Sequence, residues 1–186
     1  MKVAVFCGSG HGRLPVYAEQ AVRLGTLLAE RDMELVFGGG HVGLMGTVAD
    51  AVLAAGGRVT GVIPTALKDR EIVHTGLTQL HVVKDMHERK AMMSSLADAF
   101  VAMPGGAGTM EEIFEAWTWA MLGYHQKPCA FLNVNGYYNK LIDFIQHMVS
   151  ESFVRQSYKD MLIVEDNPLT LLQSLEAYEP PPSKWG

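Results

Sequence analysis

The sequence has 186 residues, the length of one ordinary domain, and 48% of them are hydrophobic while 19% are charged. This composition supports a buried core and excludes an intrinsically disordered chain, which lacks the apolar residues that offset ordering entropy. The net charge of −5 excludes the strongly basic surface by which proteins bind nucleic acids, so we expect no nucleic-acid partner.

Short apolar runs alternate along the chain with longer segments of helical periodicity. The predicted strands are 3–7, 35–37, 59–62, 80–83, 99–103, 129–134 and 161–164. The predicted helices are 16–30, 44–55, 86–97, 109–122, 138–149 and 169–177. Strands that alternate with helices form a parallel sheet, so we predict an α/β fold, a Rossmann-like doubly wound parallel sheet with three layers, α/β/α. Residues 1–178 form this single domain, and 179–186 are expected to be a flexible C-terminal tail.

Three glycine-rich segments follow predicted strands: CGSGHG (7–12), GGGHVGLMG (38–46) and PGGAGT (104–109). Each is a strand-to-helix junction, and in an open parallel sheet these junctions line the carboxyl edge, where backbone N–H groups and helix N-termini bind anions. A single such loop is equally well explained by a tight turn. Three of them favour a phosphate site, to which the first two loops would contribute Gly8, Ser9 and Gly39.

The second loop also matches a dinucleotide fingerprint, with glycines at positions 38, 40 and 43. The strand that follows it carries no acidic residue at its end, so the group that would hold the ribose of NAD is missing. A nucleoside-triphosphate loop of the GxxxxGK[ST] type is absent from the sequence.

The helix predicted at 86–97 has an apolar stripe, and helical spacing places Arg89 on this stripe rather than on the solvent face. A permanently charged group there calls for an anionic partner. The alternative is an arginine that extends past the neighbouring methionines to water. Lys90 is interpreted either as a helper in phosphate binding or, preferably, as a solvated surface lysine.

Glu112 has two interpretations. Thr109 and Glu112 fit a T-x-x-E capping box, in which the threonine caps the helix and the glutamate bonds back to the backbone of the cap. Alternatively, a carboxylate in the first helical turn beside an anion-binding loop lies close to whatever the phosphate is attached to. Glu111 points roughly 100° away from Glu112 around the helix, so the two are not expected to act as a carboxylate pair.

The remaining reactive side chains suggest no further chemistry. Cys7 and Cys129 fall in apolar runs and are expected to be buried thiols without a disulfide, which is typical of a cytoplasmic protein. The histidines lack metal-ligand spacing, so we expect no metal. No apolar stretch reaches the ~18 residues of a membrane helix, and no signal-peptide pattern is seen, so we expect no membrane partner.

Taken together, PGGAGTMEE (104–112), GGGHVGLMG (38–46) and HERKAMM (87–93) resemble the motifs of the LOG, or Lonely Guy, family of cytokinin riboside 5′-monophosphate phosphoribohydrolases. The resemblance covers roughly residues 2–178, and the PGGxGTxxE motif matches completely. It implies hydrolysis of an adenine-type nucleoside 5′-monophosphate, AMP or an N6-modified relative, to the free base and ribose 5-phosphate, with no cofactor. It also implies a homodimer or a larger homo-oligomer.

The resemblance assigns site residues by position. Arg89 and Glu112 match the catalytic pair of the family, and the phosphate-binding turn is matched by Gly105, Gly106, Gly108 and Thr109. Lys90 and Glu111, adjacent to the catalytic pair, are further candidates. Two rival functions use the same loops: a non-catalytic carrier of a nucleotide or pterin cofactor, and a transferase that moves the phosphoribosyl group to an acceptor other than water.

Overall fold

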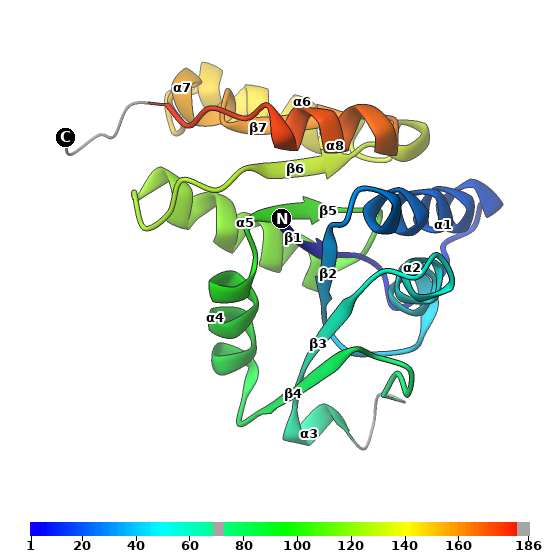
Figure 1. Ribbon diagram of the computed structural model, residues 1–186. Coiled ribbons are helices and arrows are strands. Elements are labelled where there is room, and N and C mark those ends of the chain that lie inside the picture. Colours follow the sequence, from blue (N-terminus) through cyan, green and yellow to red (C-terminus); the bar gives the residue numbers. More distant parts are fainter. Residues whose placement is uncertain (69–72, 182–186) are drawn as a thin grey trace.

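The computed structural model describes residues 1–68 and 73–181. Its centre is a seven-stranded parallel sheet with the strand order β4-β3-β2-β1-β5-β6-β7 (Figure 1). The strands are Lys2–Phe6 (β1), Glu34–Phe37 (β2), Val59–Pro64 (β3), Gln79–Val83 (β4), Ala99–Ala102 (β5), Cys129–Leu132 (β6) and Leu162–Glu165 (β7). The predicted doubly wound α/β fold is confirmed.

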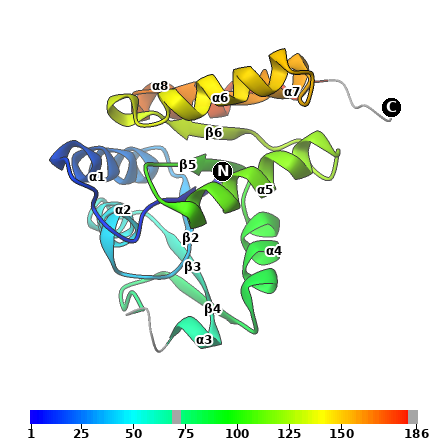
Figure 2. The same ribbon diagram turned by 180° about the vertical axis from the view of Figure 1, so that it is seen from behind.

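Helices cover both faces of the sheet. They are Pro15–Glu30 (α1), Gly43–Ala54 (α2), Thr65–Lys68 (α3), Met86–Leu96 (α4), Ala107–Met121 (α5), Asn139–Ser150 (α6), Gln156–Lys159 (α7) and Pro168–Glu176 (α8), with a short 3₁₀ helix at Val134–Gly136. Figures 1 and 2 show α1 and α2 on one side of the sheet and α4 and α5 on the other. The six long helices agree with the predicted segments to within two residues at either end. The short α3 and α7 were not predicted, because four residues are too few to show a period.

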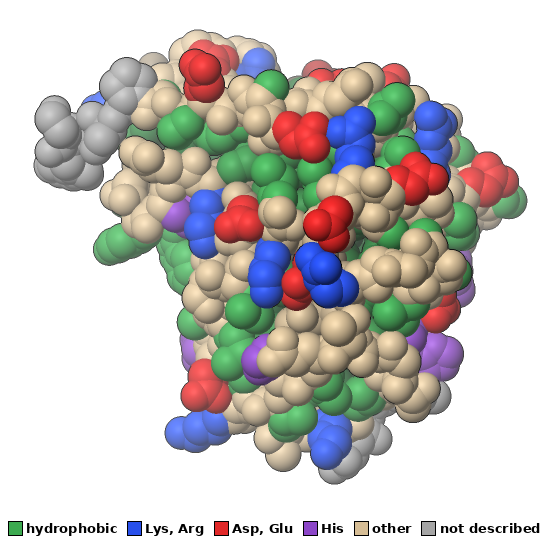
Figure 3. Space-filling model, viewed as in Figure 1, with side chains coloured by type: hydrophobic (Ala, Val, Ile, Leu, Met, Phe, Trp, Pro, Cys, Tyr) green, Lys and Arg blue, Asp and Glu red, His purple; other side chains and the backbone are tan. Residues whose placement is uncertain are grey.

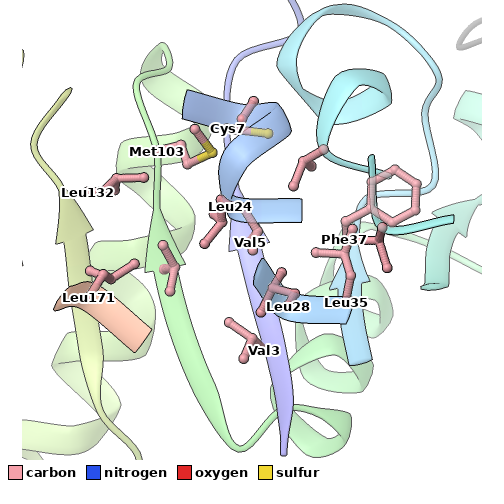
Figure 4. Close-up of a cluster of buried hydrophobic side chains, with 14 of the residues drawn as sticks. Val3, Val5, Cys7, Leu24, Leu28, Leu35, Phe37, Met103, Leu132 and Leu171 are labelled. Atoms are coloured by element: carbon pink, nitrogen blue, oxygen red, sulfur yellow. The ribbon is translucent and has the colours of Figure 1, made fainter. Parts of the chain in front are cut away.

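The core consists of two hydrophobic clusters, one on each face of the sheet, because successive strand residues point to opposite faces. Val3, Val5 and Cys7 of the first strand segment pack with α1, α2 and α8, and part of this cluster is drawn in Figure 4. Ala4 and Phe6, the alternate residues, pack with α4, α5 and α6. Burial on both faces explains why the strands appear as continuous apolar runs.

From β1 to β4 the chain adds strands on one side of β1, and from β5 to β7 it adds them on the other side. β1 pairs with β2 on one side and with β5 on the other, with Val3 opposite Ala99 in the second pairing. The strand order therefore reverses between β1 and β5. In open α/β sheets, the carboxyl edge at such a switch point is where ligands bind.

Side-chain capping fixes the beginning of α4. Asp85 accepts a hydrogen bond from the backbone N–H of Glu88 at 2.9 Å, and the Glu88 carboxylate accepts one from the backbone N–H of Lys84. The Asp85 bond is an N-cap, and the Glu88 bond reaches the residue before the cap, so together they fix the start of the helix that carries Arg89.

The surface carries both signs of charge. On the face viewed in Figure 3, lysines and arginines lie interspersed with aspartates and glutamates. Lys2 and Arg58, for example, both pair with Glu34, at 3.2 and 3.6 Å. Within the described part of the chain, no helix combines the length and the apolar character needed to cross a bilayer.

Candidate active site

The three glycine-rich loops meet at the carboxyl edge of the sheet, as predicted, because β2, β1 and β5 are neighbours. Figure 4 shows Cys7 and Met103 at the adjacent ends of β1 and β5. Gly8 ties the loops together: its N–H donates to the carbonyl of Pro104 at 3.0 Å, and its own carbonyl accepts from the N–H of Leu44 at 3.0 Å. The first loop is thus bonded to both of the others.

A cavity of about 280 Å³ opens beside these loops and contains both members of the predicted catalytic pair. Its walls combine the first loop, the start of α5, one residue of α2 and the first turn of α4. The lining residues are Cys7, Gly8, Ser9, Met45, Met86, Arg89, Gly106, Ala107, Gly108, Thr109, Glu111 and Glu112. One arginine and two glutamates therefore face the same space as a helix N-terminus.

A second cavity, of about 350 Å³, shares Gly8, Ser9 and Gly106 with the first. Gly105 lines this second cavity rather than the first. Of the other predicted site residues, Gly39 and Lys90 line neither of the two cavities. The structure therefore gathers most of the predicted site residues around the first and third loops.

The start of α5 differs from the capping-box interpretation. The helix begins at Ala107, and its cap is Gly106, which has extended backbone angles and no side chain. Thr109 is the third residue of the helix and only 4% exposed, so it does not cap the helix. The T-x-x-E interpretation of Thr109 and Glu112 is therefore wrong. Because no side chain caps this helix, its first N–H groups remain available to an anion in the cavity.

Gly105 must be a glycine for steric reasons. A Cβ atom at this position would overlap the Thr109 hydroxyl and lie 2.9 Å from the backbone nitrogen of Gly8. We expect Gly105→Ala to lower the free energy of unfolding by about 1–3 kcal/mol, the usual cost of overpacking. Gly106→Ala is the matched control, because a Cβ there meets nothing within 4 Å. Denaturant unfolding of both variants tests this, and equal stability of the two would contradict it.

Arg89 is 7% exposed, so the alternative in which it extends to water is wrong. Its Nε donates to the carbonyl of Val62 at 3.1 Å, which holds the side chain across the end of β3. A Cβ at Gly38 would overlap the guanidinium, so the second loop makes room for this side chain. The result is a buried, permanently charged cation in the wall of the cavity.

Gly39, predicted as a site residue, has a backbone role in the second loop. Its φ of +79° lies in the left-handed region that favours glycine. Its carbonyl accepts a hydrogen bond from the N–H of His74 at 3.0 Å, which ties the loop to the segment that leads to β4. In this loop, Gly38 is the glycine that contacts a candidate catalytic side chain.

Glu112 and Cys7 are close enough to influence each other. Burial raises the pKa of the Cys7 thiol, and the negative charge of Glu112 raises it further. The thiol is therefore protonated at neutral pH and is a poor nucleophile, because thiolate is the reactive form. Cys7 is therefore not a candidate nucleophile in this cavity.

Lys90 fits neither interpretation made from the sequence. Its side chain is 14% exposed, and its ammonium donates to Glu111 at 2.5 Å and to Glu115 at 2.7 Å. These carboxylates raise the pKa of Lys90. The residue is neither a solvated surface lysine nor a part of the cavity wall.

Two tyrosines that sequence reasoning did not assign to the site support the third loop. The Tyr137 hydroxyl donates to the carbonyl of Gly105, and the Tyr138 hydroxyl donates to the carbonyl of Met103, both at 2.6 Å. Tyr138 is buried, whereas Tyr137 is 44% exposed. Nothing in the sequence signals the two contacts, because the partners are more than 30 residues apart.

Comparison with known proteins places this arrangement among enzymes. A sequence model of a family described as possible lysine decarboxylase matches residues 45–175. A cytokinin riboside 5′-monophosphate phosphoribohydrolase of Arabidopsis thaliana is 49% identical over 179 residues, which cover 96% of this chain and 82% of the relative. A probable enzyme of the same name from Oryza sativa subsp. japonica is 48% identical, with 96% and 73% covered.

Solved structures share the fold at lower identity. The molybdenum cofactor binding protein of Rippkaea orientalis aligns with a TM-score of 0.72 at 20% identity, covering 95% of each chain. The molybdenum cofactor carrier protein of Chlamydomonas reinhardtii aligns with a TM-score of 0.71 at 18% identity, covering 95% of this chain and 97% of the other. At such identities the likeness concerns the fold alone.

Proposed function

The chain belongs to the LOG family of cytokinin riboside 5′-monophosphate phosphoribohydrolases, and from this premise we propose that it hydrolyses the N-glycosidic bond of adenine-type nucleoside 5′-monophosphates. Water adds to C1′, the bond between C1′ and the base nitrogen breaks, and the base leaves with a proton. The products are the free base and ribose 5-phosphate. AMP and N6-modified cytokinin riboside monophosphates are the proposed substrates.

The observation that carries the proposal is that Arg89, Glu112 and the uncapped start of α5 face one cavity. Breaking the bond develops positive charge on the ribose, which an ionised carboxylate stabilises. We assign this role to Glu112, together with orientation of the attacking water. Arg89 supplies the cationic side of the same cavity, where it binds the substrate and favours the ionised form of Glu112.

The phosphate is the proposed anchor of the substrate. The helix N-terminus at Gly106, Ala107 and Gly108 offers backbone N–H groups and the positive end of the helix dipole. Gly8, Ser9 and Thr109 line the same space. Binding energy gained at the phosphate, remote from the bond that breaks, positions the ribose for attack.

The name of the matching family model suggests decarboxylation, and the cavity argues against it. Pyridoxal-type decarboxylation depends on a lysine amine that forms an imine. Among the described residues, the walls of the two cavities include no lysine. Lys90, next to Arg89 in the chain, is held as an ammonium by two carboxylates. The hydrolase assignment therefore fits the residues better.

Several properties complete the proposal. We place the protein in the cytoplasm, as a homodimer or larger homo-oligomer, with no cofactor and no nucleic-acid partner. Residues 1–178 form the catalytic domain, followed by a tail from 179 to 186. Part of this tail, from 182, lies outside the described residues.

The phosphate anchor is tested by removing the phosphate from the substrate. We expect kcat/KM for adenosine to be at least ~30-fold lower than for AMP, because charge-assisted hydrogen bonds to the phosphate contribute roughly 1.5–3 kcal/mol each. Chromatographic measurement of free adenine from both substrates decides this. Equal rates on adenosine and AMP would contradict the anchor, and the absence of base release from AMP and from isopentenyladenosine monophosphate would reject the hydrolase.

A further inference from the structure

The two proposed catalytic side chains stand on different helices. Arg89 belongs to α4 and Glu112 to α5, and the two helices run in different directions (Figures 1 and 2). Their backbones make almost no direct contact with each other. The separation of Arg89 from Glu112 therefore depends on how side chains join the two helices.

Lys90 makes the polar connection between these helices. It follows Arg89 on α4, and its ammonium contacts Glu111 at 2.5 Å and Glu115 at 2.7 Å on α5. Glu111 and Glu115 are one helical turn apart, so one cation can pair with both. Glu112 lies between them in the chain. Lys90, the neighbour of Arg89, is thus joined to Glu111 and Glu115, which lie on either side of Glu112 in the chain.

Hydrophobic packing brings the two helices together, since Met93 of α4 and Ile113 and Trp117 of α5 belong to one cluster, but this packing is incomplete near Lys90. A gap of about 20 Å³ lies between them, lined among others by Lys90, Glu112, Glu115 and Trp119. Atoms that border a gap lose dispersion contacts on that side, so the walls can shift at low cost. The ion pair of Lys90 with Glu115 is partly buried, since the two side chains are 14% and 27% exposed, whereas Glu111 in the other pair is 53% exposed. The pair with Glu115 is therefore screened less by solvent than the pair with Glu111 is.

We propose that Lys90 is a positioning residue, whose ion pairs with Glu111 and Glu115 set the separation of Arg89 and Glu112 without contact with the substrate. The inference rests on the proposed hydrolysis. An error of about 1 Å in the placement of catalytic groups can cost roughly 100-fold in rate. Loss of the connection therefore affects the chemical step more than it affects binding of AMP.

The test compares three variants by kcat, by the Kd for AMP and by melting temperature. Lys90→Met keeps an unbranched chain but removes the charge, and we expect kcat to fall at least ~10-fold while Kd changes less than threefold. Lys90→Arg restores the charge and should recover kcat to within about threefold. Lys127→Met is the matched control. Lys127 also contacts α4, where its ammonium donates to the carbonyl of Ser94 at 2.7 Å, but this bond involves no carboxylate of α5.

The expected results separate positioning from stability. Lys127→Met should lower the melting temperature and leave kcat within twofold. If Lys127→Met lowers kcat as much as Lys90→Met does, or if Lys90→Met keeps full kcat, the proposal is overturned. Should Lys90→Met not fold, Glu115→Gln removes one of the two pairs, and we expect a loss of about threefold in kcat with unchanged Kd.

A crystal structure tests the positioning role of Lys90 separately from the proposed hydrolysis, because it does not depend on enzyme activity. In a crystal structure of Lys90→Met without ligand, α4 should be displaced relative to α5 by comparison with the unsubstituted protein. Unchanged helix positions would overturn the positioning role even in an active enzyme. A displaced α4 in a protein that releases no base would support the connection and reject the hydrolase alone.

Discussion

Replacement of Glu112 by glutamine is expected to slow release of adenine from AMP by about 100- to 1000-fold, while the Kd for AMP stays within threefold. Glutamine keeps the shape of the side chain but removes the negative charge. In the proposed mechanism the charge is needed most when the ribose becomes cationic in the transition state, whereas α5 and the first loop are the proposed holders of the phosphate. Steady-state kcat and calorimetric binding measure the two effects separately.

Glu111→Gln is the matched control for this prediction. Glu111 is adjacent in the chain and lines the same cavity, but its side chain is 53% exposed and pairs with Lys90. We expect a loss of no more than about tenfold, caused by the weakened pair with Lys90. If the two variants lose activity equally, or if Glu112→Gln retains nearly normal kcat, Glu112 does not have the assigned role.

The fold was predictable because its signal is repetitive. The central strands are buried on both faces and each long helix mainly on one, so the hydrophobic pattern changes period at almost every boundary. The boundary that failed is the start of α5. There, Gly106 adopts extended angles that let the helix begin two residues before Thr109, and a glycine cap leaves no side-chain signal to compete with the apparent T-x-x-E box.

The site was predictable where local periodicity carried the information. The apolar stripe of α4 placed Arg89 inward, and burial confirms this placement. The room that Gly38 provides and the bond to Val62 involve residues far away in the chain, so the stripe could not predict them. Gly39 shows why a glycine is hard to interpret from sequence. A glycine required by a left-handed backbone looks the same in the sequence as a glycine required by a ligand.

The supporting contacts were the least predictable part. Lys90 lies on α4, and whether it is solvated depends on two carboxylates 21 and 25 residues further along the chain. The tyrosine contacts to the third loop likewise depend on how β5 and β6 pair. Such contacts depend on how helices and strands pack in three dimensions, and the hydrophobic period of one segment carries no information about that packing.

Replacement of Arg89 by alanine is expected to lower kcat/KM for AMP by at least ~1000-fold, because charge-assisted binding and transition-state stabilisation are lost together. Arg89 is the only arginine in the described wall of the cavity, and in the proposed mechanism its cation binds the substrate beside Glu112. Its removal should therefore weaken substrate binding and charge stabilisation in the transition state together. Unlike Glu112→Gln, this variant should therefore lose affinity as well as kcat.

Two controls decide whether the loss arises in the site. Arg89→Lys keeps a positive charge but loses the planar group that bonds Val62 and faces the cavity, so we expect it to recover no more than about one tenth of the activity. Arg155→Ala removes an exposed arginine that stacks on Tyr158 at 5.8 Å, away from the glycine loops, and should leave kcat/KM within twofold. Purified Arg89→Ala protein that is folded by circular dichroism and still hydrolyses AMP normally would show that the buried cation only fills the space beside Gly38, and the catalytic assignment would have to move to another residue.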